Sequence, residues 1–150
     1  MTALVHKWLA AEAITSALTT ELNALANGAY SAASAAIDNS AGLYPFMALE
    51  LYLGSLTPAA GQYCAAYILY CLDGTNYEDG GGAVAPAAAT LAAVFDLTVS
   101  AGVKWRMRVG IPIDPYPFKL VLVNGAVTSG VALAATTNLL RYSRYYDQVV

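Results

Sequence analysis

The residues best suited to chemistry lie in one short loop, LDGTNYEDGGG, which spans residues 72–82. Among its four glycines stand four side chains with oxygen donors: Asp73, Asn76, Glu78 and Asp79. Calcium prefers several oxygen ligands from a glycine-rich loop, but the spacing here does not match the EF-hand pattern and Tyr77 interrupts it. The same residues make a good connection, because Asp-Gly supplies a tight turn and consecutive glycines adopt positive φ without strain. We expect a turn between two strands and no metal site.

The other residue types that carry catalysis are few. His6 is the only histidine, which excludes arrangements that need two. Cys64 and Cys71 lie in the runs QYC and LYC, which are typical of core strands. On one extended strand they would be roughly 23 Å apart, and a disulfide needs Cα atoms within about 7 Å. We therefore expect two free thiols, which suit a reducing cytoplasm. No motif pairs an acid with another catalytic group, so we expect no enzyme and no cofactor.

A basic row stands out in the segment VKWRMRVGI at residues 103–111. Lys104, Arg106 and Arg108 alternate there with an apolar row that runs from Val103 to Ile111. In a strand, alternate side chains point to opposite faces, so the two rows should face opposite ways. The basic row either contacts an acidic surface or is a solvated strand face that discourages edge-to-edge aggregation.

The eleven tyrosines form the second notable group. They gather in two runs: Tyr63, Tyr67 and Tyr70, then Tyr142, Tyr145 and Tyr146. Tyrosine is amphipathic and is enriched where protein surfaces meet. Ordinary strand composition, a contact with another subunit and a sugar-binding platform all remain open, because β-propensity alone also favours tyrosine.

The composition bounds the classes of function. The chain has 150 residues, the length of one domain, with 58% hydrophobic and only 11% charged residues. So few charges predict that apolar surface is buried against other copies or another protein. The net charge of −3 includes no basic excess, which argues against nucleic-acid binding. No run of 18 apolar residues is present, which argues against a transmembrane helix, and the first residues lack the order of a signal peptide.

The spacing of apolar residues along the chain predicts its helix and strands. From Thr15 to Ala26, Leu18, Leu22 and Leu25 recur at helical spacing, so we expect one short helix there. After Gly28 the period becomes that of strands. We expect strands at residues 43–54, 62–72, 91–99, 103–111, 118–125 and 138–150, and weaker ones near 29–40 and 131–136. The strand 62–72 is apolar on both faces, as expected when each face is covered. The pattern predicts a mainly β protein, an antiparallel β-sandwich or barrel.

Several stretches of the chain resemble small structural virion proteins of tailed bacteriophages. They are LTTELNALANGAYSAASAAIDN (18–39), LYLGSLTPAAGQYCAAYILYCLDGTNYEDG (51–80), GIPIDPYPFKLVLVNG (110–125) and NLLRYSRYYDQVV (138–150). The resemblance implies a jelly-roll-like β-sandwich without catalytic residues, of the kind that serves as a capsid decoration (cement) protein. It further implies a virion protein assembled in the host cytoplasm, a homotrimer, and contact with the major capsid protein.

With that resemblance we expect two regions: an N-terminal arm with a short helix at residues 1–28, and a β-sandwich domain at residues 29–150. The termini and the basic row are the expected protein contacts, because chain ends are often docked or exchanged in assemblies. The candidate contact residues are Trp8, Lys104, Arg106, Arg108, Arg141, Tyr142, Arg144, Tyr145 and Tyr146. The alternative is a carbohydrate-binding or adhesion module of a tail or fibre, which would use tyrosines and the 73–82 loop, with or without calcium.

Overall fold

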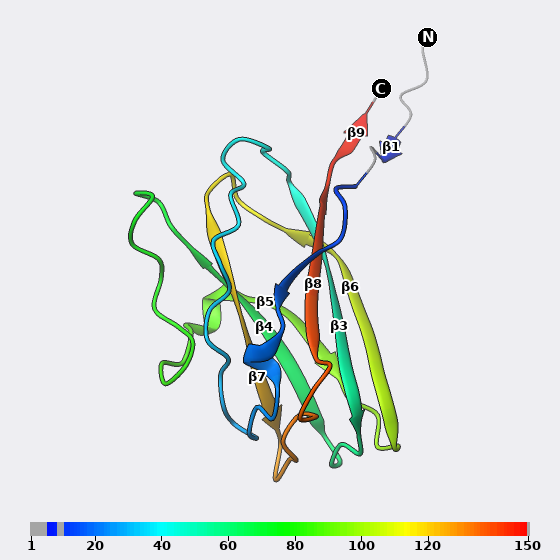
Figure 1. Ribbon diagram of the computed structural model, residues 1–150. Helices are drawn as coiled ribbons and strands as arrows, with labels where there is room; N and C mark the ends of the chain where they lie inside the picture. Colours follow the sequence, from blue (N-terminus) through cyan, green and yellow to red (C-terminus); the bar gives the residue numbers. More distant parts are fainter. Residues whose placement is uncertain (1–5, 9–10, 150) are drawn as a thin grey trace.

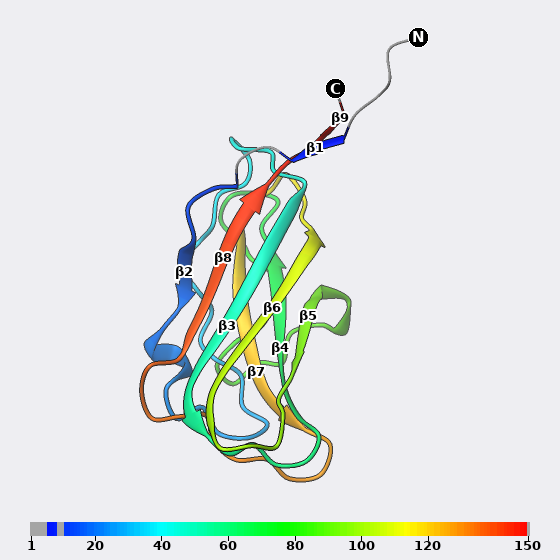
Figure 2. The ribbon, with the colours of Figure 1, turned by 90° about the vertical axis from the view of Figure 1, so that its right-hand side faces the viewer.

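The structure is a computed structural model that describes residues 6–8 and 11–149, and the side chains of residues 11–147. It is mainly β, as predicted, with antiparallel sheets. The first sheet has the order β2-β8-β3-β6, formed by Thr15–Leu18, Leu139–Tyr145, Phe46–Leu56 and Gly102–Pro112. The second has the order β5-β4-β7, formed by Leu91–Asp96, Gln62–Tyr70 and Phe118–Ala126. Figures 1 and 2 show the two sheets lying face to face.

The core between the sheets follows from alternation along β3. Met47, Leu49, Leu51 and Leu53 are fully buried, and the residues between them are less buried, as the period of two requires. Leu43, the first residue of the strand expected at 43–54, lies before β3 begins and is exposed. The second sheet contributes the opposite wall of the core through Cys64, Ala66, Ile68, Phe95, Phe118, Leu120 and Leu122.

The outer face of the second sheet is also buried in part, which confirms that β4 is covered on both sides around Leu69. Leu69 of β4 and Val121 of β7 are 1% and 0% exposed. The loop after β4 lies over them: a Cβ on Gly80 would lie 3.0 Å from the Leu69 side chain, and one on Gly81 would lie 3.2 Å from Val121. Gly81 has φ +93, a conformation that other residues rarely adopt. The 72–82 loop thus covers part of the outer face of this sheet.

The predicted strand near residues 29–40 is an irregular edge segment beside β7. Every third residue bonds to the strand: the amides of Gly28, Ser31, Ser34 and Ile37 donate to the carbonyls of Asn124, Leu122, Leu120 and Phe118. The hydroxyls of Ser31 and Ser34 also accept from the amides of Leu122 and Leu120, both at 3.0 Å. Serine side chains therefore supply acceptors that a regular strand would supply from its backbone, and residues 28–37 cover the edge of β7.

The predicted helix from Thr15 to Ala26 is wrong. The chain forms β2, which pairs with β8, and then the single 3-10 turn η1 (Thr20–Leu22). A strand followed by a tight turn also brings Leu18 and Leu22 to the same side, and both are fully buried. Tertiary pairing with β8 decided between two structures that the leucine spacing allowed. Residues 15–22 are therefore part of the body of the molecule.

The ends of the chain meet in a small ribbon that extends from one end of the sandwich (Figures 1 and 2). In it, β1 (His6–Trp8) pairs antiparallel with β9 (Asp147–Val149). Trp8, a predicted contact residue, lies in this ribbon, and its side chain is outside the described residues. Within the described ranges, no helix has the length and apolarity to cross a membrane.

Candidate functional site

The two rows of β6 do face opposite ways, and it is the apolar row that faces solvent. Val103, Trp105, Met107 and Val109 are 57, 58, 55 and 66% exposed. Lys104, in contrast, is 3% exposed. Four large apolar side chains in line on one strand exceed the scattered exposure that is normal for a monomer, and such a patch marks an interaction surface.

A bulge at Gly110 separates Ile111 from this row, contrary to the prediction. In the register between β3 and β6, Met47 pairs with Ile111 but Leu49 pairs with Arg108, so two residues of β6 oppose one of β3. Gly110 has φ +71, the conformation that such a bulge requires of one residue. Because the extra residue reverses the side-chain direction, Ile111 points into the core and is 5% exposed.

The apolar row belongs to a larger surface, the outer face of the first sheet. We call it the contact face and define it by Ile14, Phe46, Ala48, Glu50, Tyr52, Val103, Trp105, Met107, Val109, Arg141, Ser143 and Tyr145. Its β3 and β8 members alternate with core residues and are paired across the strands, Phe46 with Tyr145 and Glu50 with Arg141. Apart from Ser143 they are partly or largely exposed. The second sheet is covered by the chain's own loop, whereas this face carries no such cover among the described residues.

One chain of polar and aromatic contacts crosses the contact face. Glu50 forms an ion pair with Arg141 and also accepts a hydrogen bond from Trp105 Nε1 at 2.7 Å. The Trp105 ring meets Tyr52 edge to face, with centroids 5.9 Å apart. These contacts connect β8, β3 and β6, and they hold the exposed Trp105 in one orientation. A fixed aromatic side chain loses little conformational entropy when a partner covers it.

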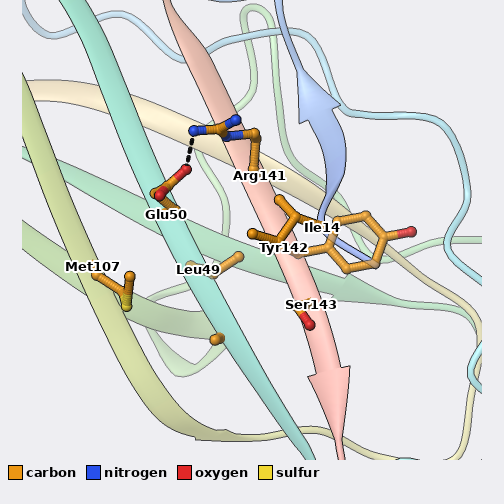
Figure 3. A pocket seen from close by; sticks show the side chains of 8 residues that line it. Ile14, Leu49, Glu50, Met107, Arg141, Tyr142 and Ser143 are labelled. Atoms are coloured by element: carbon orange, nitrogen blue, oxygen red, sulfur yellow. Dashed lines mark ion pairs between the residues drawn. The ribbon is translucent and has the colours of Figure 1, made fainter. Parts of the chain in front are cut away.

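A hollow of about 60 Å³ lies beside the ion pair, between β8 and β3 (Figure 3). Its apolar wall includes Ile14, Ala48 and Met107, and its polar wall is Glu50 and Arg141. Arg141 Nε is buried there without a hydrogen-bond partner, and Glu50 Oε1 makes no hydrogen bond besides the ion pair. Buried polar atoms in folded proteins are usually bonded, so these two atoms are exceptions, and the accessible lining of the hollow beside them is almost entirely apolar.

The basic row of β6 bonds within the molecule. Arg106 donates to the carbonyl of Asp96 at 2.8 Å and to Thr98 Oγ1 at 3.0 Å, which closes the side of the sandwich between β5 and β6. The ammonium of Lys104 donates to the carbonyl and the hydroxyl of Ser100. The buried position of Lys104 does not favour contact with another chain.

Two of these basic side chains also protect an edge of β6, a strand that pairs with β3 alone within the described part of the chain. Arg106 donates to the carbonyl of Trp105 at 2.8 Å, and Arg108 donates to the carbonyl of Met107 at 3.1 Å. In an edge strand, alternate residues direct their backbone groups away from the neighbouring strand. The two guanidinium groups thus occupy acceptors that a foreign strand would need.

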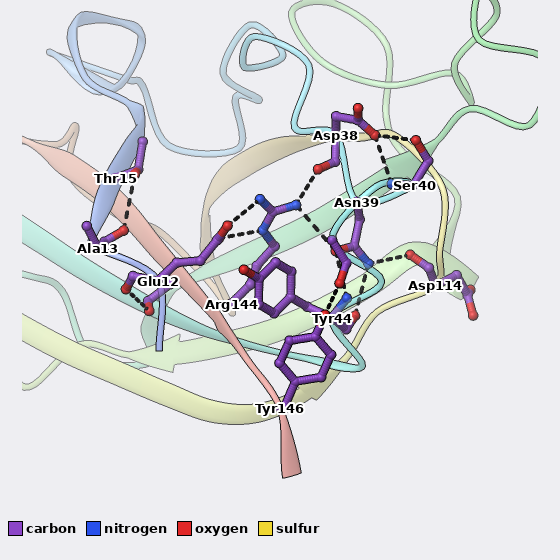
Figure 4. A network of polar contacts seen from close by, with 12 residues as sticks. Glu12, Ala13, Thr15, Asp38, Asn39, Ser40, Tyr44, Asp114, Arg144 and Tyr146 are labelled. Carbon is purple, nitrogen blue, oxygen red and sulfur yellow. Dashed lines mark hydrogen bonds and ion pairs between the residues drawn. The ribbon is translucent and has the colours of Figure 1, made fainter. Parts of the chain in front are cut away.

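Arg144, another predicted contact residue, holds the N-terminal segment in place (Figure 4). Its guanidinium donates two hydrogen bonds, of 2.7 and 2.8 Å, to the Glu12 carboxylate. It also donates to the Asp38 carbonyl and to Asn39 Oδ1, and it lies 4.8 Å from the centre of the Tyr44 ring. Burial lowers the pKa of Arg144, but the hydrogen bond and charge of Glu12 outweigh it and raise the pKa. We call this group the Arg144 clasp.

The three tyrosines predicted as contact residues, Tyr142, Tyr145 and Tyr146, lie on different surfaces of the protein. Tyr145 lies on the contact face, where it stacks on Phe46 with centroids 5.9 Å apart and accepts a bond from the Gly110 amide at 2.7 Å. Tyr142 packs against the core from the other face of the strand. Tyr146 donates to the carbonyl of Gly42 and lies near Tyr44. Of the predicted residues whose side chains are described, only Arg141 and Tyr145 lie on the contact face.

The contact face also holds residues that the sequence reasoning did not select, above all Trp105, Met107 and Glu50. The alternation of residues along β6 identifies the apolar row but carries no information about which face of the strand is exposed to solvent. Charged residues are normally the exposed ones, so alternation alone favours the charged row as the contact surface.

The carboxylate of Asp73 holds the 72–82 loop in its turn. It accepts from the amides of Asn76 and Thr75 at 2.7 and 2.9 Å, and these bonds lower its pKa well below its usual range. Glu78 accepts from the amide of Tyr70 at 2.9 Å. Across residues 6–8 and 11–149, no three acidic, histidine or cysteine side chains gather as a metal site would need.

Both cysteines are free and buried, which confirms the predicted absence of a disulfide between them. Burial raises the pKa of the Cys64 thiol to about 12. A thiol that stays protonated at physiological pH is a poor nucleophile and behaves as a small apolar side chain.

A second group of tyrosines lies on the other sheet. Tyr63 and Tyr67 project from the outer face of β4, and the Tyr63 ring lies where a side chain on the paired Gly125 would stand. Burial raises the pKa of Tyr67, and its neighbours Tyr30 and Tyr63 add to the rise. The three tyrosines therefore lie near one another and are each partly exposed, and we call them the tyrosine patch. Exposed aromatic rings are surfaces on which a sugar ring can stack.

Comparison of the chain with protein-family models, with curated proteins and with solved structures finds no match.

Proposed function

We propose that this chain is a structural virion component of a tailed bacteriophage, a capsid decoration (cement) protein that acts by protein–protein contact and not by catalysis. The observation that carries the proposal is the contact face, an aromatic and aliphatic sheet surface left uncovered on a charge-poor molecule. Such a surface is stable in water mainly when another protein covers it.

The strand order supports a jelly-roll-like fold. If residues 28–37 count as an edge strand beside β7, the two sheets read β2-β8-β3-β6 and 28–37-β7-β4-β5. This is the order of an eight-stranded double-sheet roll made of two Greek keys, an architecture that recurs in viral capsid proteins and in lectins. The fold therefore agrees with the proposal, although fold alone does not assign a function.

The partners that we propose are copies of the same chain and the major capsid protein, in a virion assembled in the host cytoplasm. The resemblance implies a homotrimer. A three-fold ring needs two different surfaces on each subunit, whereas the contact face is one surface. The ribbon of β1 and β9 is a further proposed contact, because a lone two-stranded ribbon is only marginally stable.

Co-sedimentation with purified capsids tests the proposal. The wild-type protein should pellet with capsids and stay in the supernatant without them. Met107→Glu places a charge on the contact face and should abolish pelleting. Val127→Glu is the matched control, because Val127 is 80% exposed and lies outside the face. A folded wild-type protein that never pellets with capsids would rule the decoration role out.

The alternative function, a carbohydrate-binding or adhesion module of a tail or fibre, is favoured by the patch of Tyr30, Tyr63 and Tyr67. Lectins share the strand order described above. A glycan array, with and without a chelator, tests it. Binding that is lost in Tyr67→Ala and kept in Tyr116→Ala would support this function over the first, since Tyr116 is an exposed tyrosine outside the patch.

A further inference from the structure

We propose that the partner covering the contact face is a second copy of this chain, packed face to face across a two-fold axis. The inference rests on the proposed function and names the partner of the same surface. Three properties of the face carry it: its charge, its area and its shape.

The charge of the face fits a copy of itself. Its charged residues are Glu50 and Arg141, which form an ion pair with each other. The face is therefore neutral as a whole and offers no field that would select an acidic or a basic partner. A second copy presents an equally neutral surface, so two faces approach each other without like-charge repulsion.

The area of the face fits a stable dimer. At about 3.3 Å per residue, the 11 residues of β3 extend over about 36 Å. The neighbouring strands β2, β8 and β6 have 4, 7 and 11 residues, so with strands about 4.8 Å apart the face covers about 500 Å². Specific interfaces bury on the order of 800 Å² per partner, so the face supplies the larger part of one.

The shape favours a two-fold pairing of faces over a pairing of edges. Arg106 and Arg108 occupy carbonyls at the free edge of β6, which opposes strand-to-strand addition there. On the face, the exposed row of β6 and the hollow beside Glu50 lie on the same surface. An isologous contact uses one patch on both subunits, so each copy presents its row and its hollow to the other. Trp105, Met107, Tyr145 and Arg141 are of the residue types enriched at such interfaces.

The test is the mass of the purified protein in solution, measured by sedimentation equilibrium over a range of concentrations. Wild-type protein should have the mass of two chains. Met107→Glu should weaken self-association on the order of 100-fold, because a carboxylate would be buried without a partner. Val127→Glu should remain a dimer. If Met107→Glu fails to fold, Val109→Glu serves in its place, since Val109 is 66% exposed.

Several outcomes would overturn the inference: a monomer at every concentration, a mass of three chains, or a dimer that Met107→Glu leaves intact. The result is separable from that of the capsid experiment. A monomer that pellets with capsids removes the two-fold pairing and keeps the decoration role. A dimer that never pellets with capsids keeps the pairing and removes the decoration role.

Discussion

The Arg144 clasp makes a quantitative prediction about how the N-terminal segment is held. Replacing Arg144 with alanine removes both bonds to Glu12, the bonds to the Asp38 carbonyl and the Asn39 side chain, and the contact with the Tyr44 ring. We predict that this single change destabilises the fold and loosens residues 11–18 and the 38–44 loop together, because one guanidinium holds both segments to β8.

The expected loss of stability in Arg144→Ala follows from how deeply the ion pair between Arg144 and Glu12 is buried. Exposed ion pairs contribute about 0.2–1 kcal/mol, and removing one partner of a fully buried pair costs about 3–5 kcal/mol. The Arg144 and Glu12 side chains are 11 and 29% exposed, which places the pair between these limits at about 2 kcal/mol. The lost contacts with residues 38–44 add about 1 kcal/mol. Arg144→Ala should thus cost about 3 kcal/mol, or about 6–12 °C in Tm for a domain of this size.

The assay is urea unfolding of a double-mutant cycle. Glu12→Ala should cost about 2 kcal/mol, and the double variant should cost less than the two single variants together by about 1.5 kcal/mol. Arg108→Ala is the control, because Arg108 is an exposed arginine whose hydrogen bond stays within its own strand and whose guanidinium lies 5.8 Å from the Phe95 ring centre, near the outer limit of a cation–π contact. The change should alter stability by less than about 0.5 kcal/mol. Hydrogen exchange should show faster exchange at the Glu12 amide, which donates to the Arg144 carbonyl.

The reasoning is refuted if Arg144→Ala costs no more than the Arg108 control. It is also refuted if Arg144→Ala and Glu12→Ala are additive, since the bidentate pair would then carry no coupling energy.

Three further predictions concern the edge, the loop and the thiols. Arg106→Ser with Arg108→Ser should uncap the β6 edge and produce large species in light scattering that Lys119→Ser does not; an unchanged size would contradict edge protection. Because the pKa of Asp73 is lowered in the fold, its carboxylate stabilises the protein above pH 3.8, and this contribution is lost as pH falls through the folded pKa. Asp73→Asn should therefore flatten acid unfolding curves; curves of unchanged slope would argue against it. Cys64 and Cys71 should react with a thiol reagent at pH 8 only after unfolding; rapid labelling of native protein would disprove their burial.

The strands were the predictable part of the fold. Alternation along residues 46–56 identifies β3, because a period of two matches an extended chain with one face covered. The continuous apolar run at 62–70 identifies β4 as a strand with both faces covered. The segment from Thr15 to Ala26 could not be predicted, since its leucine spacing fits both a helix and a strand followed by a turn. The choice depended on β8, more than 100 residues away, whose edge β2 pairs with.

The burial of polar side chains could not be predicted from the sequence either. Gln62 and Asn124 are 1% and 0% exposed, and they bond to each other and to the carbonyl of Val131. In the sequence they read as ordinary polar residues at the ends of strands. Only the folded chain brings their partners within hydrogen-bond distance, and without those partners their burial would be costly.

Residues 103–109 form a strand with one apolar and one basic side because of alternation, which is a local property of the chain and can be read from the residues alone. Which of the two sides faces solvent depends on contacts with distant parts of the folded chain. Arg106 and Lys104 find carbonyl and hydroxyl partners on residues 96–100, so the basic side turns toward the second sheet. The apolar side is left on the surface, and a candidate contact face results from partners that no local pattern contains.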